Sequence, residues 1–176
     1  RHSGTFTDSH GAVMPPIYAT STFAQPAPGQ HTGYEYSRSG NPTRHALETA
    51  IADLENGTRG YAFASGLAAI STVLELLDKD SHLVAVDDVY GGTYRLLENV
   101  RRRSAGLQVS WVKPDDLAGI EAAIRPDTRM IWVETPTNPL LKLADLSAIA
   151  AIARRHNLIS VADNTFASPA IHRPLE

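Results

Sequence analysis

Hydrophobic residues recur every three or four positions in the segment that follows residue 40, which is the spacing of an amphipathic helix. Asn41 suits the N-cap of this helix and Pro42 suits its first turn, while Asn56 and Gly57 are typical of its end. The sequence therefore predicts a helix that begins at Pro42 and stops before Asn56. Its apolar positions are Leu47, Ile51 and Leu54.

Beyond residue 60, short apolar runs alternate with helical patterns. The expected strands cover residues 60–64, 82–86, 107–112, 129–133 and 158–162. The expected helices cover residues 65–77, 92–103, 115–124 and 145–156. Several of the strands are continuous apolar runs, which is typical of strands that helices bury on both faces. We therefore expect the α/β fold class, as a three-layer α/β/α domain with a mainly parallel sheet.

The first 40 residues have a different character, because they are rich in Gly, Pro, Ser and Thr and show no sustained periodicity. Met14-Pro15-Pro16 is one of their turn-forming stretches. We expect residues 1–40 to form an extended arm and residues 41–176 to form most of one domain.

Composition excludes several classes of function. The net charge is −3 and the longest basic run is Arg101-Arg102-Arg103, so the sequence shows no electrostatic footprint for nucleic acid or an anionic membrane. The chain has no cysteine, which excludes disulfides and thiolate catalysis within it. The seven histidines lack metal-ligand spacing, so each is expected to be exposed or satisfied, and no metal site is proposed. No apolar run approaches the roughly 20 residues that span a bilayer.

Polar residues follow the predicted strands at the point where each strand ends, and ligands of parallel sheets bind at this edge. Ser65 and Gly66 open a helix, so the free N–H groups there suit an anion, although the same pair is an ordinary cap. Asp163 follows an apolar strand, where a carboxylate needs a cation or hydrogen bonds, and its alternative is a turn aspartate. Tyr90 and Asn138 either serve a ligand or only pack and form turns.

Arg38 and the three lysines are the cationic side chains with a bearing on ligand binding. Arg38 follows Tyr36 in the arm, and its guanidinium fork suits a phosphate dianion, whereas an exposed arginine is usually only solvated. The lysines are Lys79, Lys113 and Lys142, and we expect all three away from the polar clusters at the strand ends.

Six segments carry motifs that, taken jointly, are distinctive. They are Gly11–Phe23, Tyr34–Arg44, Ala62–Ala69, Asp87–Thr93, Glu134–Pro139 and Asp163–Phe166. In this order they resemble the successive signatures of the Cys/Met-metabolism (trans-sulfuration) family of pyridoxal-phosphate enzymes, the family that contains cystathionine γ-lyases and γ-synthases. The resemblance covers nearly the whole chain.

The resemblance implies a pyridoxal 5'-phosphate cofactor and a fold-type I large domain, cut short in this chain. It implies that the backbone N–H groups of Gly66 and Leu67 hold the cofactor phosphate of their own subunit. Tyr36 and Arg38 would grip the phosphate of a neighbouring subunit. The resemblance therefore implies a cytoplasmic homo-oligomer, a tetramer built from dimers that share active sites.

The resemblance also implies roles around the cofactor ring. Tyr90 would stack on the ring and assist proton transfer as a catalytic residue, and Asn138 would donate a hydrogen bond near the ring hydroxyl. Asp163 would keep the ring nitrogen protonated, and Thr165 would be a further cofactor contact. Arg95 would lie on the side of the substrate, a sulfur amino acid.

The implied reaction is γ-elimination on cystathionine or a related sulfur amino acid, with γ-replacement on an activated homoserine as the alternative. The family's lysine that binds the cofactor covalently follows the Asp-Asn-Thr-Phe motif and is expected beyond Glu176. We therefore expect the chain to be inactive by itself. A non-catalytic fragment or interaction module is the hypothesis from another class of function.

Overall fold

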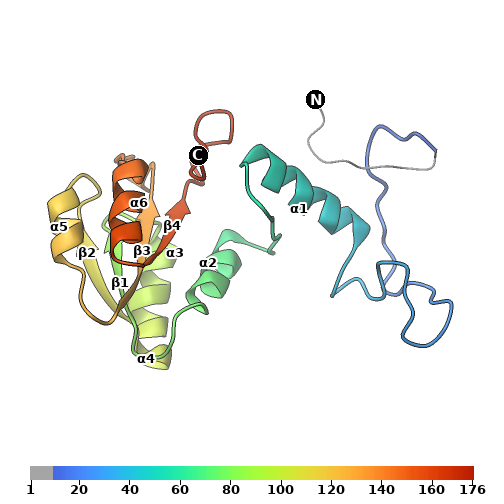
Figure 1. Cartoon of the computed structure of the whole chain (residues 1–176), viewed down its shortest axis with the longest axis horizontal. Helices are drawn as coiled ribbons and strands as arrows, with labels where there is room; N and C mark the ends of the chain where they lie inside the picture. The colour runs from blue at the N-terminus through green and yellow to red at the C-terminus, as the bar shows by residue number, and fades with distance from the viewer. Residues whose placement is uncertain (1–9) are drawn as a thin grey trace. The chain divides into compact units, whose positions relative to one another are not determined.

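The computed structural model describes residues 10–176 and divides the chain into two compact units. The first unit runs to Ala62 and also contains Leu175–Glu176, and the second unit is Phe63–Pro174 (Figure 1). The boundary predicted after residue 40 falls inside the first unit, at the start of a helix. The division into an arm and a domain stays a prediction.

Helix α1 (Pro42–Leu54) lies where the apolar periodicity predicts it. The side chain of Asn41 accepts hydrogen bonds from the backbone N–H groups of Thr43 at 2.9 Å and Arg44 at 3.4 Å. This is the capping role that the sequence predicts. Asn56 has a positive φ of 55° just after the helix, as expected of a residue that ends one.

Residues 10–40 contain no helix, and two short stretches of them lie side by side. An antiparallel bridge joins Thr22 to Tyr36, and the N–H of Phe23 donates to the carbonyl of Glu35 at 3.0 Å. The described part of the predicted arm is therefore a loose hairpin rather than a simply extended chain. The rest of the arm, residues 1–9, lies outside the described residues.

The second unit is built on a four-stranded sheet whose neighbouring strands are all parallel. Its strands are β1 (His82–Val86), β2 (Gln108–Val112), β3 (Thr128–Glu134) and β4 (Ile159–Asp163). They lie in the order β2-β1-β3-β4. Four of the five predicted strands and the parallel arrangement are thereby confirmed.

The fifth predicted strand, residues 60–64, is wrong, because these residues are a connecting segment without strand structure. The backbone N–H of Ala62 donates to the Glu48 carboxylate at 3.0 Å instead of to a neighbouring strand. A short apolar run looks the same in sequence whether or not a partner strand lies beside it, so periodicity alone does not separate the two cases.

Helices flank this sheet in two groups. The helical segments are α2 (Gly66–Leu74), α3 (Gly91–Arg95), the π-helical η1 (Leu96–Arg101), α4 (Arg102–Ala105), α5 (Leu117–Ala122) and α6 (Leu146–Arg155). Helix α6 contacts β3, β4 and α5, whereas α2 contacts α3, which continues through η1 into α4. Right-handed connections put the two groups on opposite faces of the sheet, and Figure 1 shows α6 and the α3–α4 run on different sides. Helices α2 and α5 are shorter than predicted, since α2 ends at Leu74 and α5 covers only Leu117–Ala122.

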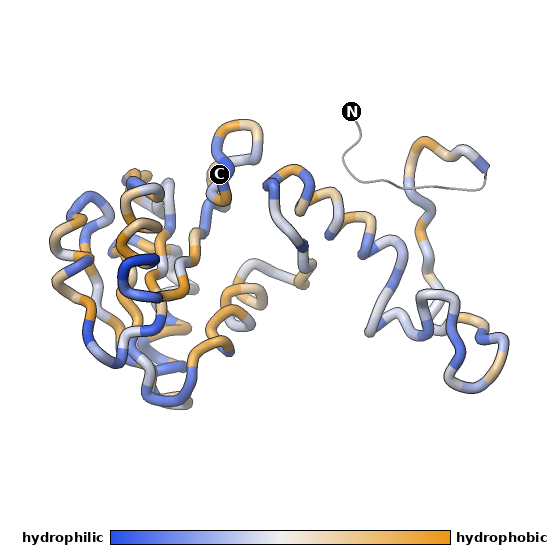
Figure 2. Tube along the Cα trace, viewed as in Figure 1, coloured by the Kyte–Doolittle hydropathy of each residue, from blue (hydrophilic) through white to orange (hydrophobic). Residues whose placement is uncertain are grey.

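The core of this unit surrounds the two central strands. Every residue of β1 is buried, and in β3 every residue except Arg129 is buried. The edge strands β2 and β4 are only partly buried, because each has a strand on one side alone. Burial on both faces therefore holds for the central strands and not for the edges, and Figure 2 shows the apolar residues concentrated along the sheet. Within residues 10–176, no helix has the length and apolar character to cross a membrane.

Candidate active site

The strand order gives the second unit a topological switch point at the carboxyl edge of its sheet. From β1 the chain crosses to β2 on one side, whereas from β3 it crosses to β4 on the other side. The loops after β1 and β3 therefore leave in opposite directions, and the region between such loops is where α/β sheets bind ligands. Tyr90 lies in the first loop, Asn138 lies in the second, and Asp163 ends β4.

The carboxylate of Glu134, the last residue of β3, joins these two loops. Its Oε2 accepts a hydrogen bond from the backbone N–H of Tyr90 at 2.8 Å, and its Oε1 accepts one from the backbone N–H of Asn138 at 3.0 Å. Glu134 is only 4% exposed, and it pairs in register with Asp163 on the neighbouring strand. Three of the predicted site residues therefore lie around one buried carboxylate.

Burial raises the pKa of the Glu134 carboxyl above its ordinary value of 4.5, and the charge of Asp163 adds to this rise. The hydrogen bonds from Tyr90 and Asn138 lower the pKa of Glu134, because they stabilise its ionised form. The sheet edge thus carries two neighbouring carboxyl groups, one buried and one partly exposed. Negative charge at this edge favours the protonated form of a basic ligand group that binds beside Asp163.

A second set of contacts joins the same two loops. The Thr137 hydroxyl and the Leu140 N–H donate to Oδ2 of Asp88 at 2.6 Å and 3.1 Å. The Lys142 ammonium donates to Oδ1 of Asp87 at 3.0 Å. The expectation that Lys142 lies away from the polar strand ends is therefore wrong. The loop after β3 folds back against the loop after β1, and residue spacing does not reveal this.

Asp163 is partly buried and forms a turn with the residues that follow it. Its Oδ1 accepts hydrogen bonds from the N–H of Thr165 at 3.1 Å and from the Thr165 hydroxyl at 2.5 Å. This is the turn geometry that the sequence leaves open as the alternative for Asp163. The roles of Asp163 and Thr165 toward a cofactor stay predictions.

Tyr90 presents a partly exposed ring at the sheet edge. It occupies the N-cap position of α3, and 46% of it is exposed. The ring lies so close to the backbone of Gly92 that a Cβ at Gly92 would collide with it. The glycine therefore lets the ring lie against the first helical turn, in a position where one of its faces suits stacking.

Ser65 caps α2, because its hydroxyl accepts a hydrogen bond from the N–H of Ala68 at 3.2 Å. The alternative of an ordinary cap is thus confirmed for Ser65. The space beside Gly66 is open, since a Cβ built there would meet nothing within 4 Å. The binding of a phosphate by Gly66 and Leu67 stays a prediction.

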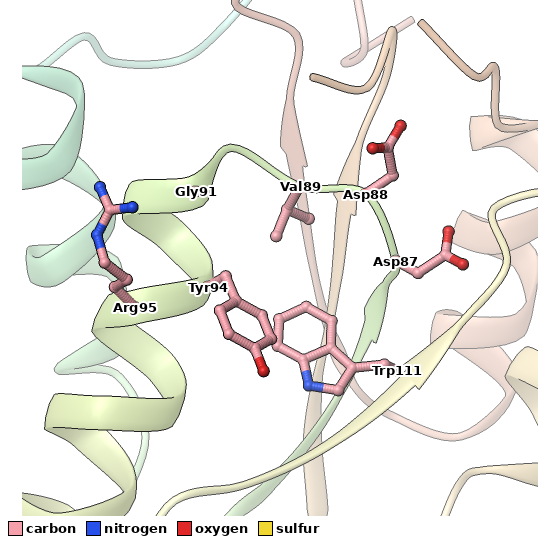
Figure 3. Close-up of a pocket in the computed structure, with 7 residues that line it drawn as sticks. All are labelled: Asp87, Asp88, Val89, Gly91, Tyr94, Arg95 and Trp111. Carbon is pink, nitrogen blue, oxygen red and sulfur yellow. The ribbon is translucent and has the colours of Figure 1, made fainter. Parts of the chain in front are cut away.

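A pocket of about 460 Å³ opens beside the loop after β1 (Figure 3). Figure 3 shows the rings of Tyr94 and Trp111 side by side, with their centroids 5.3 Å apart, whereas the side chains of Asp87 and Asp88 point away from these rings. The guanidinium of Arg95 folds back toward Gly91, and a Cβ added at Gly91 would lie 3.1 Å from it. Arg95 thus borders the pocket, and its role toward a substrate stays a prediction. The lining residues are Asp87, Asp88, Val89, Gly91, Tyr94, Arg95 and Trp111.

Tyr36 and Arg38 lie together in the first unit. The guanidinium of Arg38 lies 4.9 Å from the centroid of the Tyr36 ring, which is a cation–π contact. The side chain of Arg44 donates to the carbonyls of Ser37 at 3.1 Å and Arg38 at 3.3 Å, and so fixes the backbone of this segment. The contact of Tyr36 and Arg38 with a neighbouring subunit stays a prediction.

Sequence reasoning missed the residues that hold the loops together. Glu134, Asp88 and Thr137 lie inside recognised motifs, yet no role is predicted for any of them. For Glu134 a signal was available. It ends an apolar strand, and the argument that a carboxylate there needs partners applies to it as well as to Asp163.

Nearly the whole chain matches one protein family. The model of this family, described as Cys/Met metabolism PLP-dependent enzyme, matches residues 2–176. The chain belongs to this family. The membership confirms the resemblance that the six motifs carry, and it implies pyridoxal phosphate (PLP) as the cofactor.

Relatives within this family differ in the reactions that their names state. A cystathionine beta-lyase of Coxiella burnetii is 58% identical over 99% of this chain, and a probable cystathionine gamma-synthase of Herpetosiphon aurantiacus is 51% identical over 99%. The crystal structure of cystathionine gamma-lyase from Lactobacillus plantarum, complexed with L-serine, matches 99% of the chain with a TM-score of 0.94 and 51% identity. This likeness confirms the predicted fold class. The chain spans 46%, 54% and 45% of these three proteins, or about half their length.

The groups at the sheet edge fit the cofactor of a PLP-dependent family. Tyr90 offers a partly exposed ring for stacking, and Asp163 offers a carboxylate for a basic ring nitrogen. The N-terminus of α2, with open space beside Gly66, offers N–H groups that suit a phosphate. The chemistry of the donor set therefore agrees with the family membership.

Proposed function

We propose that the intact protein is a PLP-dependent carbon–sulfur lyase that cleaves cystathionine, or a related sulfur amino acid, by γ-elimination. The observation that carries this proposal is the arrangement of Tyr90, Asn138 and Asp163 around Glu134 at the switch point of a parallel sheet. Membership in a PLP-dependent enzyme family and the names of the relatives support the cofactor and the class of substrate. Arg95, at the border of the adjacent pocket, meets the substrate.

Each proposed site residue has a distinct task. The bound cofactor supplies an electron sink for the negative charge that develops on the α and β carbons of the substrate. Asp163 holds a proton on the ring nitrogen, with Thr165 bonded to its carboxylate. Tyr90 stacks its ring on the cofactor ring and moves a proton through its hydroxyl, and Asn138 donates a hydrogen bond near the ring hydroxyl. The N–H groups of Gly66 and its neighbour Leu67 bind the phosphate.

The relatives favour β-elimination as a second candidate reaction, because the cystathionine beta-lyase of Coxiella burnetii is 58% identical to this chain. γ-Replacement on an activated homoserine is supported by the probable gamma-synthase, which is 51% identical. All three reactions use the same cofactor groups at the sheet edge. The groups that select among them are therefore expected around the substrate.

The intact protein is proposed to be a cytoplasmic homo-oligomer, a tetramer built from two dimers, in which Tyr36 and Arg38 of one subunit reach the cofactor phosphate of another. The apolar side of α1 supports association. Its residues Leu47, Ile51 and Leu54 are 54%, 46% and 43% exposed within the described chain. Contiguous exposed apolar residues of this kind mark surfaces that bind another protein.

The products made from cystathionine by the full-length protein test the reaction. γ-Elimination yields cysteine, ammonia and 2-oxobutanoate, whereas β-elimination yields homocysteine, ammonia and pyruvate. γ-Replacement instead joins cysteine to an activated homoserine, releases the activating group and forms no ketoacid. Identification of the ketoacid by mass spectrometry therefore separates the two eliminations, and a second assay with cysteine and an activated homoserine detects γ-replacement. The absence of all of these products would contradict the proposed function.

Asp163→Asn tests the role of the carboxylate at the ring nitrogen. We expect the variant to retain the cofactor but to turn over about 100-fold more slowly or worse, because it lacks the charge that keeps the ring protonated. Asp145→Asn is the matched control, since Asp145 only caps α6 by accepting the N–H of Ala148 at 2.9 Å. Turnover near the parental rate in Asp163→Asn would remove Asp163 from the mechanism.

A further inference from the structure

Glu134 has no task in the reaction proposed above, although it contacts the backbone of two residues that do. It is 4% exposed, and a buried carboxylate is costly unless hydrogen bonds compensate it. Both of its oxygens are compensated by backbone N–H groups, at 2.8 Å and 3.0 Å. Hydrogen bonds to a charged acceptor are about twice as strong as neutral ones, so this carboxylate holds its two donors firmly.

We propose that Glu134 is a positioning residue that sets where the side chains of Tyr90 and Asn138 meet the cofactor. This inference rests on the proposed function, because it takes Tyr90 and Asn138 as contacts of the cofactor ring. Each donated N–H belongs to the residue whose side chain acts, so the hydrogen bond fixes the point from which that side chain extends. A single planar carboxylate between two donors also fixes the two residues relative to each other.

The other contacts between these loops are less able to do this. Lys142 and Asp87 form an ion pair, but their side chains are 35% and 37% exposed, and exposed pairs contribute little in water. Asp88 binds Thr137 and Leu140, which lie beside Asn138 rather than at it. Tyr90 begins α3 without a side-chain cap of its own. The Glu134 carboxylate is therefore the contact that acts directly on both Tyr90 and Asn138.

Amide hydrogen exchange in the cofactor-free, full-length protein tests the contact itself. Glu134→Gln keeps one carbonyl acceptor and Glu134→Ala keeps none, so we expect a graded effect. The amides of Tyr90 and Asn138 should exchange about tenfold faster or more in Glu134→Ala, and at least one of them should do so in Glu134→Gln. Asp116→Asn is the control, because this carboxylate accepts only the Gly119 N–H within its own helix cap.

Kinetics of the loaded protein then separate positioning from general support of the fold. We expect Glu134→Gln to lower kcat by about tenfold, with KM and the melting temperature changed little, because misplaced reacting groups slow chemistry without weakening substrate binding. A purely structural role would lower the melting temperature and leave kcat per folded molecule unchanged. That result would overturn the proposal.

The outcomes for Glu134 and for the proposed function can be told apart. If both amides stay protected in Glu134→Gln and Glu134→Ala while Asp163→Asn abolishes turnover, the positioning role fails and the proposed function stands. A second outcome is that the two amides exchange faster in the variants while the parent protein neither binds PLP nor releases a ketoacid. The hydrogen bonds are then real, but the positioning role fails together with the proposed function. Freed amides with a selective loss of kcat support both. Because Glu134→Gln preserves size and one acceptor, the test does not depend on whether Glu134→Ala folds.

Discussion

Replacement of His82 should destabilise the second unit, because this histidine ties three strands together at the amino edge of the sheet. It is fully buried, in agreement with the expectation of a satisfied histidine. Its Nδ1 lies 2.7 Å from the Thr128 hydroxyl on β3, and its Nε2 lies 3.0 Å from the Ser110 hydroxyl on β2. The Thr128 hydroxyl also accepts the backbone N–H of Arg125 at 2.7 Å.

The magnitude follows from these contacts. Each hydrogen bond contributes about 1 kcal/mol net, and removal of the buried ring leaves a cavity. His82→Ala should therefore lower the free energy of unfolding by about 3 kcal/mol, a large part of the stability of a typical domain. His156→Ala is the matched control, because His156 lies at the end of α6, partly exposed and bonded to Glu121 at 3.0 Å. Its replacement should cost less than about 0.5 kcal/mol.

The same contact predicts a pH dependence of defined sign. Burial lowers the pKa of His82 below its ordinary 6.5, and repulsion from Arg125 lowers it further. The folded protein therefore binds this proton less readily than the unfolded chain does. The stability that the neutral ring contributes is complete above pH 6.5, and it is lost as the pH falls below 6.5 toward the folded pKa, by up to about 1.4 kcal/mol per pH unit.

Urea unfolding, followed by the fluorescence of Trp111 and Trp132, measures both effects at about pH 7.5 and about pH 5.5. We expect the parent to lose more stability between these pH values than His82→Ala does. The comparison cancels the titration of groups that the two proteins share. Equal losses in parent and variant, or a destabilisation at neutral pH no larger than that of His156→Ala, would refute this reasoning.

Two further predictions concern the cofactor. Arg38→Ala should weaken PLP binding by about tenfold in the assembled protein, because it removes a cation from the proposed phosphate site of a neighbouring subunit. Arg59, an exposed arginine with no proposed role, is the control, and Arg59→Ala should leave PLP binding unchanged. Equal affinities of the two variants, measured by cofactor titration, would contradict this. Residues 1–176 alone, mixed with PLP and reduced with borohydride, should show no stoichiometric label on lysine by mass spectrometry, because the amine of Lys142 is bound to the Asp87 carboxylate. Full labelling of Lys142 together with release of a ketoacid would overturn that expectation.

The element order and the helix caps could be predicted from the sequence because they depend on near neighbours. Asn41 caps α1 and Ser65 caps α2, each through hydrogen bonds to residues two or three positions away. The position of the polar residues at the carboxyl edge of the sheet could also be predicted, since the ends of parallel strands meet at one edge whatever their order. The connecting segment 60–64 and the position of Lys142 did not follow, because both depend on contacts with distant parts of the chain.

Glu134 and Asp163 each end a strand, although the sequence predicts a role for Asp163 alone. A carboxylate at the end of an apolar strand needs partners, and this holds for Glu134 as well as for Asp163. The two residues are register partners at the ends of adjacent strands, and Glu134 is the more deeply buried of the pair. Its partners are backbone N–H groups, which every non-proline residue possesses and which therefore leave no mark in sequence. The need for partners could thus be read from the chain, whereas their identity required the fold that brings the two loops together.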